Sequence, residues 1–120
     1  ALYHELDRLH TADSCLIGEH DFKSFCANRR MKKSTVRRID EIRIVEHGTK
    51  LEFLYTGNGF LYNMVRILTG TLLEVGSGTR RPEKMKEIIA AKNRDMAGRT
   101  APPEGLFLLH VGYEGERETV

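Results

Sequence analysis

The sequence predicts a single α+β domain in which helices pack on a mixed, mainly antiparallel sheet. Apolar residues recur at helical spacing over residues 59–76, whereas they alternate with polar residues around Ile42 and again around Phe53. Residues 106–111 are apolar at both parities, as expected of a central strand that is covered on both faces. With 120 residues and 40% apolar content, the chain is long enough to form one core.

The N-terminal half begins with two short helical patterns. Leucines at helical spacing in residues 2–9 predict an amphipathic helix. Asp21 is suited to cap a second helix, over residues 22–26, that carries its aromatic residues on one face. The two alternating segments then flank residues 47–49, and this arrangement predicts an antiparallel hairpin.

In the C-terminal half, residues 56–59 break the second strand and begin the helix of residues 59–76. Gly76-Ser77-Gly78 ends that helix. Pro82 suits the first turn of a further helix. Its core-facing positions are Met85, Ile88, Ile89 and Lys92.

Arg66 is an unusual residue within the helix of residues 59–76. Its neighbours three and four positions away are Tyr62, Asn63, Thr69 and Gly70, so no carboxylate lies within intrahelical reach. A guanidinium group cannot lose its proton, and therefore needs a distant carboxylate, a phosphate or water. Two interpretations remain: the side chain follows the helix surface to solvent, or it presents a cation to a cleft.

Basic residues are concentrated in residues 29–38, called here the basic segment. It holds six cations and no acidic residue before Asp40, although the net charge of the whole chain is only +2. Such a segment is either a solvated loop or a surface that binds phosphates. Arg80-Arg81 form a second, smaller cluster.

Other classes of site lack support in the sequence. Cys15 and Cys26 are too few for a zinc site or a disulfide framework, so reduced thiols in a cytosolic protein are the simplest account. No apolar run is long enough to cross a bilayer, and no signal-peptide pattern is present. Gly76-Ser77-Gly78 lacks the ending of a phosphate loop. The histidines show no metal-ligand spacing. His20-Asp21 is interpreted more simply as a helix cap with its neighbour than as a catalytic dyad.

Three blocks of sequence resemble the tRNA pseudouridine synthase A family. Residues 59–76, which read GFLYNMVRILTGTLLEVG, are similar to the family's specific signature. Residues 18–25 (GEHDFKSF) and 100–108 (TAPPEGLFL) resemble an earlier and a later segment, in the family's order. Together the blocks extend over nearly the whole chain.

The resemblance implies an isomerase that converts uridine to pseudouridine in the tRNA anticodon stem-loop without a cofactor. In that family the catalytic aspartate belongs to a Gly-Arg-Thr-Asp block in the N-terminal half, together with a tyrosine that stacks on the target base. Here Gly98-Arg99-Thr100 is followed by Ala101, and this triplet is expected to be a loop that enters the last strand. Because the chain also opens at Ala1 rather than at Met, residues 1–120 are expected to be the C-terminal domain of a two-lobed enzyme, inactive without its N-terminal catalytic lobe.

The resemblance also implies roles for individual residues. Arg66 would pair with the catalytic aspartate of the other lobe. Leu106 would pack against the target uracil, although it suits an ordinary core position almost equally well, and Asn63 and Tyr62 would line the same cleft. Our candidates for contacts with tRNA phosphates are Lys23, Arg29, Arg30, Lys32, Lys33, Arg37 and Arg38. Family members are cytoplasmic homodimers, so some apolar surface is expected to be a subunit interface.

Two alternatives from other classes remain open. The first is a free-standing RNA-binding module, an idea weakened by the absence of the aromatic strand signature of an RRM. The second is a structural dimerisation domain. The coding sequence upstream of Ala1 separates the enzyme from these two alternatives. A Gly-Arg-Thr-Asp segment there would favour the enzyme, and its absence would favour the others.

Overall fold

The computed structural model describes residues 2–47, 50–102, 107–111 and 116–119, with side chains over residues 5–47 and 51–102. Within these ranges a five-stranded sheet is combined with three α-helices and two short 3-10 helices. In chain order the elements are α1 (Leu2–Ser14), β1 (Gly18–Asp21), η1 (Lys23–Phe25), β2 (Val36–His47), β3 (Lys50–Gly57), α2 (Met64–Gly76), α3 (Lys84–Ala91), η2 (Arg94–Met96), β4 (Phe107–Val111) and β5 (Glu116–Thr119).

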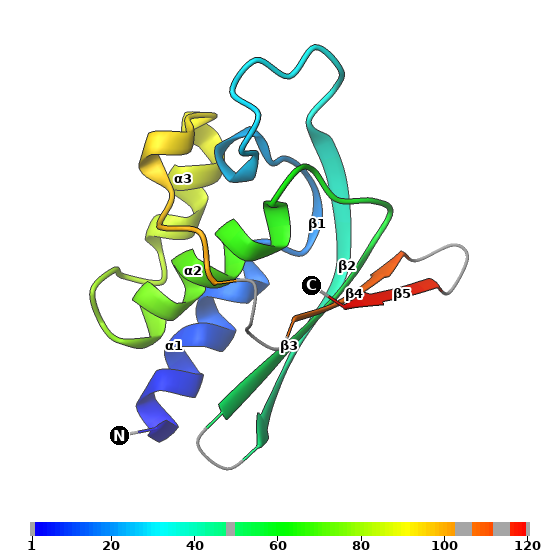
Figure 1. The fold of residues 1–120 in the computed structure, drawn as a ribbon. Coiled ribbons are helices and arrows are strands. Elements are labelled where there is room, and N and C mark those ends of the chain that lie inside the picture. Colours follow the sequence, from blue (N-terminus) through cyan, green and yellow to red (C-terminus); the bar gives the residue numbers. More distant parts are fainter. Residues whose placement is uncertain (1, 48–49, 103–106, 112–115, 120) are drawn as a thin grey trace.

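The strands lie in the order β1-β2-β3-β4-β5, and this sheet confirms the predicted α+β class. Adjacent strands are antiparallel except β3 and β4, which are parallel. Parallel pairing needs a long crossover, and here α2, α3 and η2 provide it between the two strands. Figure 1 shows the three α-helices together on one side of the sheet. In the described part of the chain, no helix has both the length and the apolar character needed to cross a bilayer.

The core lies between the helices and the covered face of the sheet. Phe53 and Tyr55 of β3 are buried there with Leu68 of α2. The hydroxyl groups of Tyr55 and Thr69 are 2.6 Å apart, so the polar end of the buried tyrosine is satisfied. A β-bulge at Asp40 shifts the register of β2, and it lets the buried Ile39 share the covered face with Ile42.

The predicted helix over residues 22–26 is wrong. Asp21 ends the strand β1, and only the single turn η1 follows it. The Asp21 carboxylate does accept a hydrogen bond from the Lys23 amide at 3.1 Å, but it also accepts one from the Thr35 hydroxyl at 2.5 Å. Pairing with β2 and the contact with Thr35 therefore fix this segment in place of a helix.

Two details of the later elements also differ from expectation, and a third lies outside the described residues. The helix around Arg66 begins at Met64 rather than at residue 59, because Asn63 adopts a left-handed backbone with φ 57°. Lys92 does not face the core: it ends α3 with φ 49° and is exposed. Residue 106, the expected start of the last strand, lies outside the described residues, and β4 is described from Phe107.

Residues 97–101 lie directly on α2, and this contact positions the functional site. The Gly98 amide donates to the Thr71 hydroxyl at 2.8 Å, and the Ala101 amide donates to the Arg66 carbonyl at 2.9 Å. Gly70, between them on the helix, has no room for a side chain, since an added Cβ would overlap the carbonyl oxygen of Arg99. The segment approaches the helix backbone this closely because residue 70 is glycine.

Replacing Gly70 by Ala should destabilise the chain by about 1–3 kcal/mol, since the new methyl group must push the 97–101 segment away from α2. Gly76→Ala is a matched control in the same helix, because its Cβ would meet only Leu9 side-chain atoms at 3.4 Å. Alanine is favoured over glycine in helices by about 0.8–1 kcal/mol, so the control should be neutral or stabilising. Urea unfolding of both variants measures the difference, and equal stabilities would contradict the proposed packing role.

Asp13, in α1, is a buried acid without adequate hydrogen bonds. Its side-chain atom Oδ2 has no hydrogen-bond partner, and His10 Nδ1 lies 3.5 Å from it. Burial raises the pKa of Asp13 to about 6, although His10 partly opposes the shift. Between its ordinary pKa and this raised pKa, the folded chain binds more protons at Asp13 than the unfolded chain does.

The free energy of unfolding should therefore fall as pH rises toward 6, and Asp13→Asn should remove this dependence. Because asparagine resembles the protonated acid, the stability gained by the substitution should grow by roughly 2 kcal/mol between pH 4 and pH 7. Urea unfolding across that range measures it, with Asp7→Asn as the control at an exposed site of the same helix. A gain that does not vary with pH would count against an ionised, buried Asp13.

Candidate functional site

Arg66 lies in the first turn of α2, half-buried, with its stem held by a backbone carbonyl. Its Nε donates to the Ala101 carbonyl at 2.8 Å, while the Ala101 amide donates back to the Arg66 carbonyl at 2.9 Å. Among the described residues, its two terminal nitrogens have no hydrogen-bond partner, and neither is sealed from the surface. The side chain is thus fixed at Nε and open at its tip.

Within the described ranges, no carboxylate lies in ion-pair distance of Arg66. Other arginines do have such partners: Arg29 pairs with Asp95 at 2.6 Å, and Arg80 with Glu74 at 2.9 Å. A planar guanidinium tip with two free nitrogens suits a carboxylate or phosphate, which it can bind through parallel hydrogen bonds. The geometry therefore leaves a place for an anion from outside the described residues.

Glu74 binds residues 97–101, the segment whose Ala101 carbonyl accepts the hydrogen bond from Arg66. Its Oε2 accepts the Arg99 amide at 3.1 Å and its Oε1 accepts Arg80 Nε at 2.9 Å. Burial alone would raise the pKa of Glu74, but the hydrogen bonds from Arg80 and the Arg99 amide outweigh it, and the pKa is lowered. Glu74 therefore remains an anion at neutral pH and keeps both contacts. Arg66, Gly70 and Glu74 form a stripe at four-residue spacing along α2, and residues 97–101 lie along it.

Tyr62 and Asn63 immediately precede α2, at the same end as Arg66. Tyr62 is 70% exposed, and its carbonyl accepts the Ala27 amide at 3.0 Å. The Asn63 carbonyl accepts the Ile67 amide at 2.9 Å and so begins the helix hydrogen bonding. The structure thus places both residues at the entrance of α2, next to the chain that leads into the basic segment.

Residues 29–35 of the basic segment lie in the connection between η1 and β2, which projects from the end of the molecule at which α2 begins (Figure 1), and residues 36–38 are the start of β2. Four of its six cations point into solvent without lying on a strand: Arg29, Arg30, Lys32 and Lys33. Among the described residues, Lys23, Arg30, Lys32 and Lys33 have no ion pair. These four side chains are therefore available to phosphates.

The remaining basic candidates have partners. Arg29 is paired with Asp95 of η2. Arg37 donates to the Ser34 and Val36 carbonyls at 2.9 and 2.7 Å, and Arg38 pairs with Asp40 at 2.7 Å. Arg37 and Arg38 therefore stabilise the local chain through these contacts and also contribute positive charge to the basic segment.

Three further sequence expectations concern Leu106, the Gly98-Arg99-Thr100 triplet and metal binding. Leu106 lies outside the described residues, so its contacts are not described. Gly98-Arg99-Thr100 forms a loop before β4, as expected, but it also packs on α2, which the sequence did not indicate. No group of histidines, cysteines and acidic residues within the described ranges could hold a metal ion, and Cys15 and Cys26 are both free.

Sequence reasoning missed the roles of Glu74 and Ala101. Their partners lie 25 and 35 residues away along the chain, beyond the reach of any helical or strand pattern. The one available signal was a glycine four residues after Arg66 in a buried helix, since such a glycine often marks a close backbone approach.

Comparison with known proteins shows the family of this chain. A model of the family described as tRNA pseudouridine synthase matches residues 12–114. A tRNA pseudouridine synthase A from Anoxybacillus flavithermus is 54% identical over 99 residues, which are 82% of this chain and 40% of the relative. A tRNA pseudouridine synthase A 1 from Bacillus cereus is 49% identical over 109 residues, or 91% of this chain and 44% of the relative.

A third relative, a tRNA pseudouridine synthase A from Limosilactobacillus fermentum, is 46% identical over 112 residues, or 92% of this chain and 43% of the relative. The chain thus spans less than half the length of the curated relatives that it matches. The family match covers most of the chain, including α2 with Arg66 and the segment that holds it. On these grounds the chain belongs to the tRNA pseudouridine synthase family.

Proposed function

We propose that this chain is the C-terminal lobe of an enzyme that isomerises uridine to pseudouridine in the tRNA anticodon stem-loop. Arg66 carries the proposal, because its stem is fixed on Ala101 and its tip has no acidic partner among the described residues. The acid would be a catalytic aspartate on an N-terminal lobe of the same protein. The lobe described here would be inactive without it.

The proposed reaction breaks the glycosidic N–C bond, turns the uracil and forms a C–C bond to the same sugar, without a cofactor. The ring carbon that joins the sugar loses its proton, and the released ring nitrogen gains one, so the product is an isomer of the substrate. The aspartate must be ionised to act on the nucleotide. A cation next to a carboxylate lowers the pKa of that carboxylate by roughly 1–3 units, so Arg66 would keep the aspartate charged at neutral pH.

The geometry of Arg66 also restricts how the two groups meet. Its Nε is already bonded to the Ala101 carbonyl, so only the two terminal nitrogens remain for the carboxylate. The aspartate would therefore approach the tip end-on and accept two parallel hydrogen bonds. A lysine at this position would offer a point charge without that directional pair.

Substrate binding is assigned to the surface around the start of α2. The target base must leave its stack to be reached, so the enzyme has to hold RNA backbone on either side of it. The exposed cations Lys23, Arg30, Lys32 and Lys33 suit the phosphates, and the largely exposed Tyr62 and the neighbouring Asn63 would border the cleft. Arg29, Arg37 and Arg38 would add positive charge, and Leu106 would pack against the uracil.

The whole enzyme is proposed to be a cytoplasmic homodimer that binds tRNA across both subunits. The decisive experiment expresses the full-length protein and measures pseudouridine formation in unmodified tRNA. Formation in the anticodon stem-loop supports the proposal. Binding of tRNA without isomerisation would favour an RNA-binding module instead, and absence of both would favour a structural domain.

Arg66→Lys in the full-length enzyme should lower turnover at least about tenfold, which corresponds to about 1.4 kcal/mol of transition-state stabilisation. The lysine keeps the charge but loses both the Ala101 contact and the paired hydrogen bonds. Single-turnover rates on unmodified tRNA measure the change.

Arg8→Lys is the matched control, because Arg8 is a part-buried arginine that donates to the carbonyls of Val75 and Gly76 at the opposite end of α2. Its turnover should stay close to wild type, and thermal unfolding verifies that both variants are folded. Wild-type turnover in Arg66→Lys would refute the assigned role.

Replacing Lys32 and Lys33 together by Gln should weaken tRNA binding and flatten its salt dependence. Each phosphate contact that is lost should lower the slope of log K against log salt by roughly 0.7–0.9. The double variant Arg43→Gln, Lys86→Gln is the control, since it removes two exposed charges outside the basic segment. If both double variants give the same slope, Lys32 and Lys33 do not contact phosphates.

A further inference from the structure

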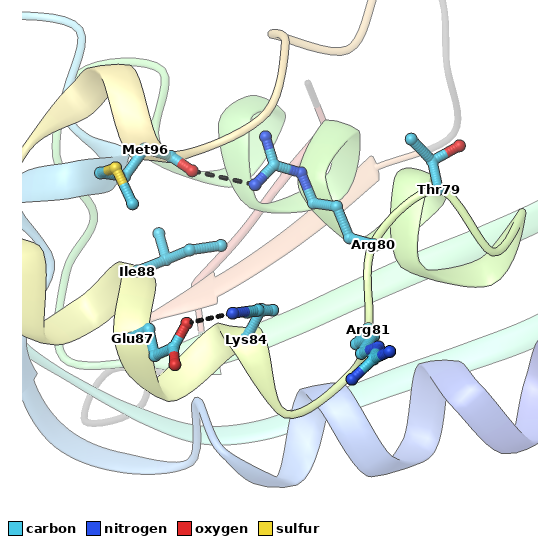
Figure 2. Close-up of a pocket in the computed structure, with 7 residues that line it drawn as sticks. All are labelled: Thr79, Arg80, Arg81, Lys84, Glu87, Ile88 and Met96. Atoms are coloured by element: carbon cyan, nitrogen blue, oxygen red, sulfur yellow. Dashed lines mark hydrogen bonds and ion pairs between the residues drawn. The ribbon is translucent and has the colours of Figure 1, made fainter.

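A hollow lies between α3, η2 and the α2–α3 connection, and one of its side chains, Arg80, also binds Glu74. The hollow has a volume of about 360 Å³ and is shown in Figure 2. Three cations, one acid and two apolar side chains line most of it: Arg80, Arg81, Lys84, Glu87, Ile88 and Met96. The volume is within the range of small-molecule sites, roughly 300–1,000 Å³.

The cations of the hollow differ in how firmly they are held. Arg80 is fixed, because its Nε donates to Glu74 and its Nη1 donates to the Met96 carbonyl, both at 2.9 Å. Lys84 pairs with Glu87 at 2.9 Å, but both side chains are more than half exposed, so this pair is weak and exchangeable. Among the described residues, the exposed Arg81 has no ion pair or side-chain hydrogen bond. The hollow therefore offers a phosphate two cations: Arg81, which has no partner among the described residues, and Lys84, whose weak ion pair with Glu87 a phosphate can replace.

The apolar side chains complete a surface that suits a nucleotide. Ile88 is buried beneath the hollow, whereas Met96 is 46% exposed and so can be reached from solvent. Figure 2 shows Ile88 between Met96 and the Lys84–Glu87 pair. A base face can lie against the polarisable thioether while its phosphate reaches Arg81 and Lys84.

The 3-10 helix η2 connects this hollow to the basic segment. At one side Asp95 pairs with Arg29, and at the other the Met96 carbonyl accepts a hydrogen bond from Arg80. Arg94, the first residue of the same short helix, has its pKa lowered by burial and by the nearby charge of Arg29. One residue from each of two basic clusters, about fifty positions apart in sequence, thus contacts η2.

We propose that the hollow binds one unpaired nucleotide of the tRNA substrate. The residues that line the hollow are remote in the protein sequence from the basic segment. The phosphate of this nucleotide lies between Arg81 and Lys84, and its base lies against Met96 above Ile88. Any base can place its face against Met96, so the proposed contact does not depend on sequence. This inference depends on the proposed function, because it takes tRNA as the substrate.

The test measures tRNA affinity against salt concentration in the full-length protein. Arg81→Gln with Lys84→Gln should lower the slope of log K against log salt by about 0.7–0.9 for the lost phosphate contact. Met96→Ala should instead weaken binding by at least about fivefold without changing the slope, because a stacked base contributes affinity that does not depend on ions.

The matched control is Arg43→Gln with Lys86→Gln, which removes the same charge from exposed positions outside the hollow. A control slope equal to that of the Arg81 and Lys84 variant would overturn the phosphate assignment, and wild-type affinity in Met96→Ala would overturn the base assignment. In either case a wild-type protein that still binds and isomerises tRNA leaves the proposed function intact. Wild-type protein that binds no tRNA would remove the proposed function and this inference together.

Discussion

The close contact between α2 and residues 97–101 is the constraint on which the functional site depends. A loop is ordinarily the most mobile part of a domain, but this one has its amides bound to groups of a buried helix. Gly70 permits the approach, and Glu74 holds the segment through its Arg99 amide. The Ala101 carbonyl consequently occupies a defined position, and it orients the stem of Arg66.

This arrangement prepares Arg66 for an anion before any anion arrives. An arginine side chain loses rotational freedom when it binds an anion. The contact with Ala101 already restricts the Arg66 side chain, so less freedom remains to be lost on binding. The position at the start of α2 adds to the effect, because the helix dipole is positive at its N-terminus. The cation and the dipole therefore favour negative charge at the same point.

The sequence predicted those elements whose own pattern determines them. The hairpin of β2 and β3, α2 and α3 follow from alternation and helical spacing. β1 was missed because its four residues form a strand only by pairing with β2, and local propensity instead favoured a cap at Asp21. Arg66 was recognisable because α2 offers it no intrahelical carboxylate, whereas its contact with Ala101 joins residues 35 positions apart and leaves no periodic signal.

The exposed ion pair of Arg29 and Asp95 has more consequence for charge than for stability. Such a pair contributes little free energy of folding, since both side chains are more than half exposed to water and salt. It nevertheless keeps the acid of η2 ionised and paired, because the hydrogen bond and charge of Arg29 lower the pKa of Asp95. The same short segment continues into residues 97–101. RNA backbone that binds along η2 would therefore lie against the chain that orients Arg66, and substrate binding and the alignment of the arginine would depend on one continuous stretch of backbone.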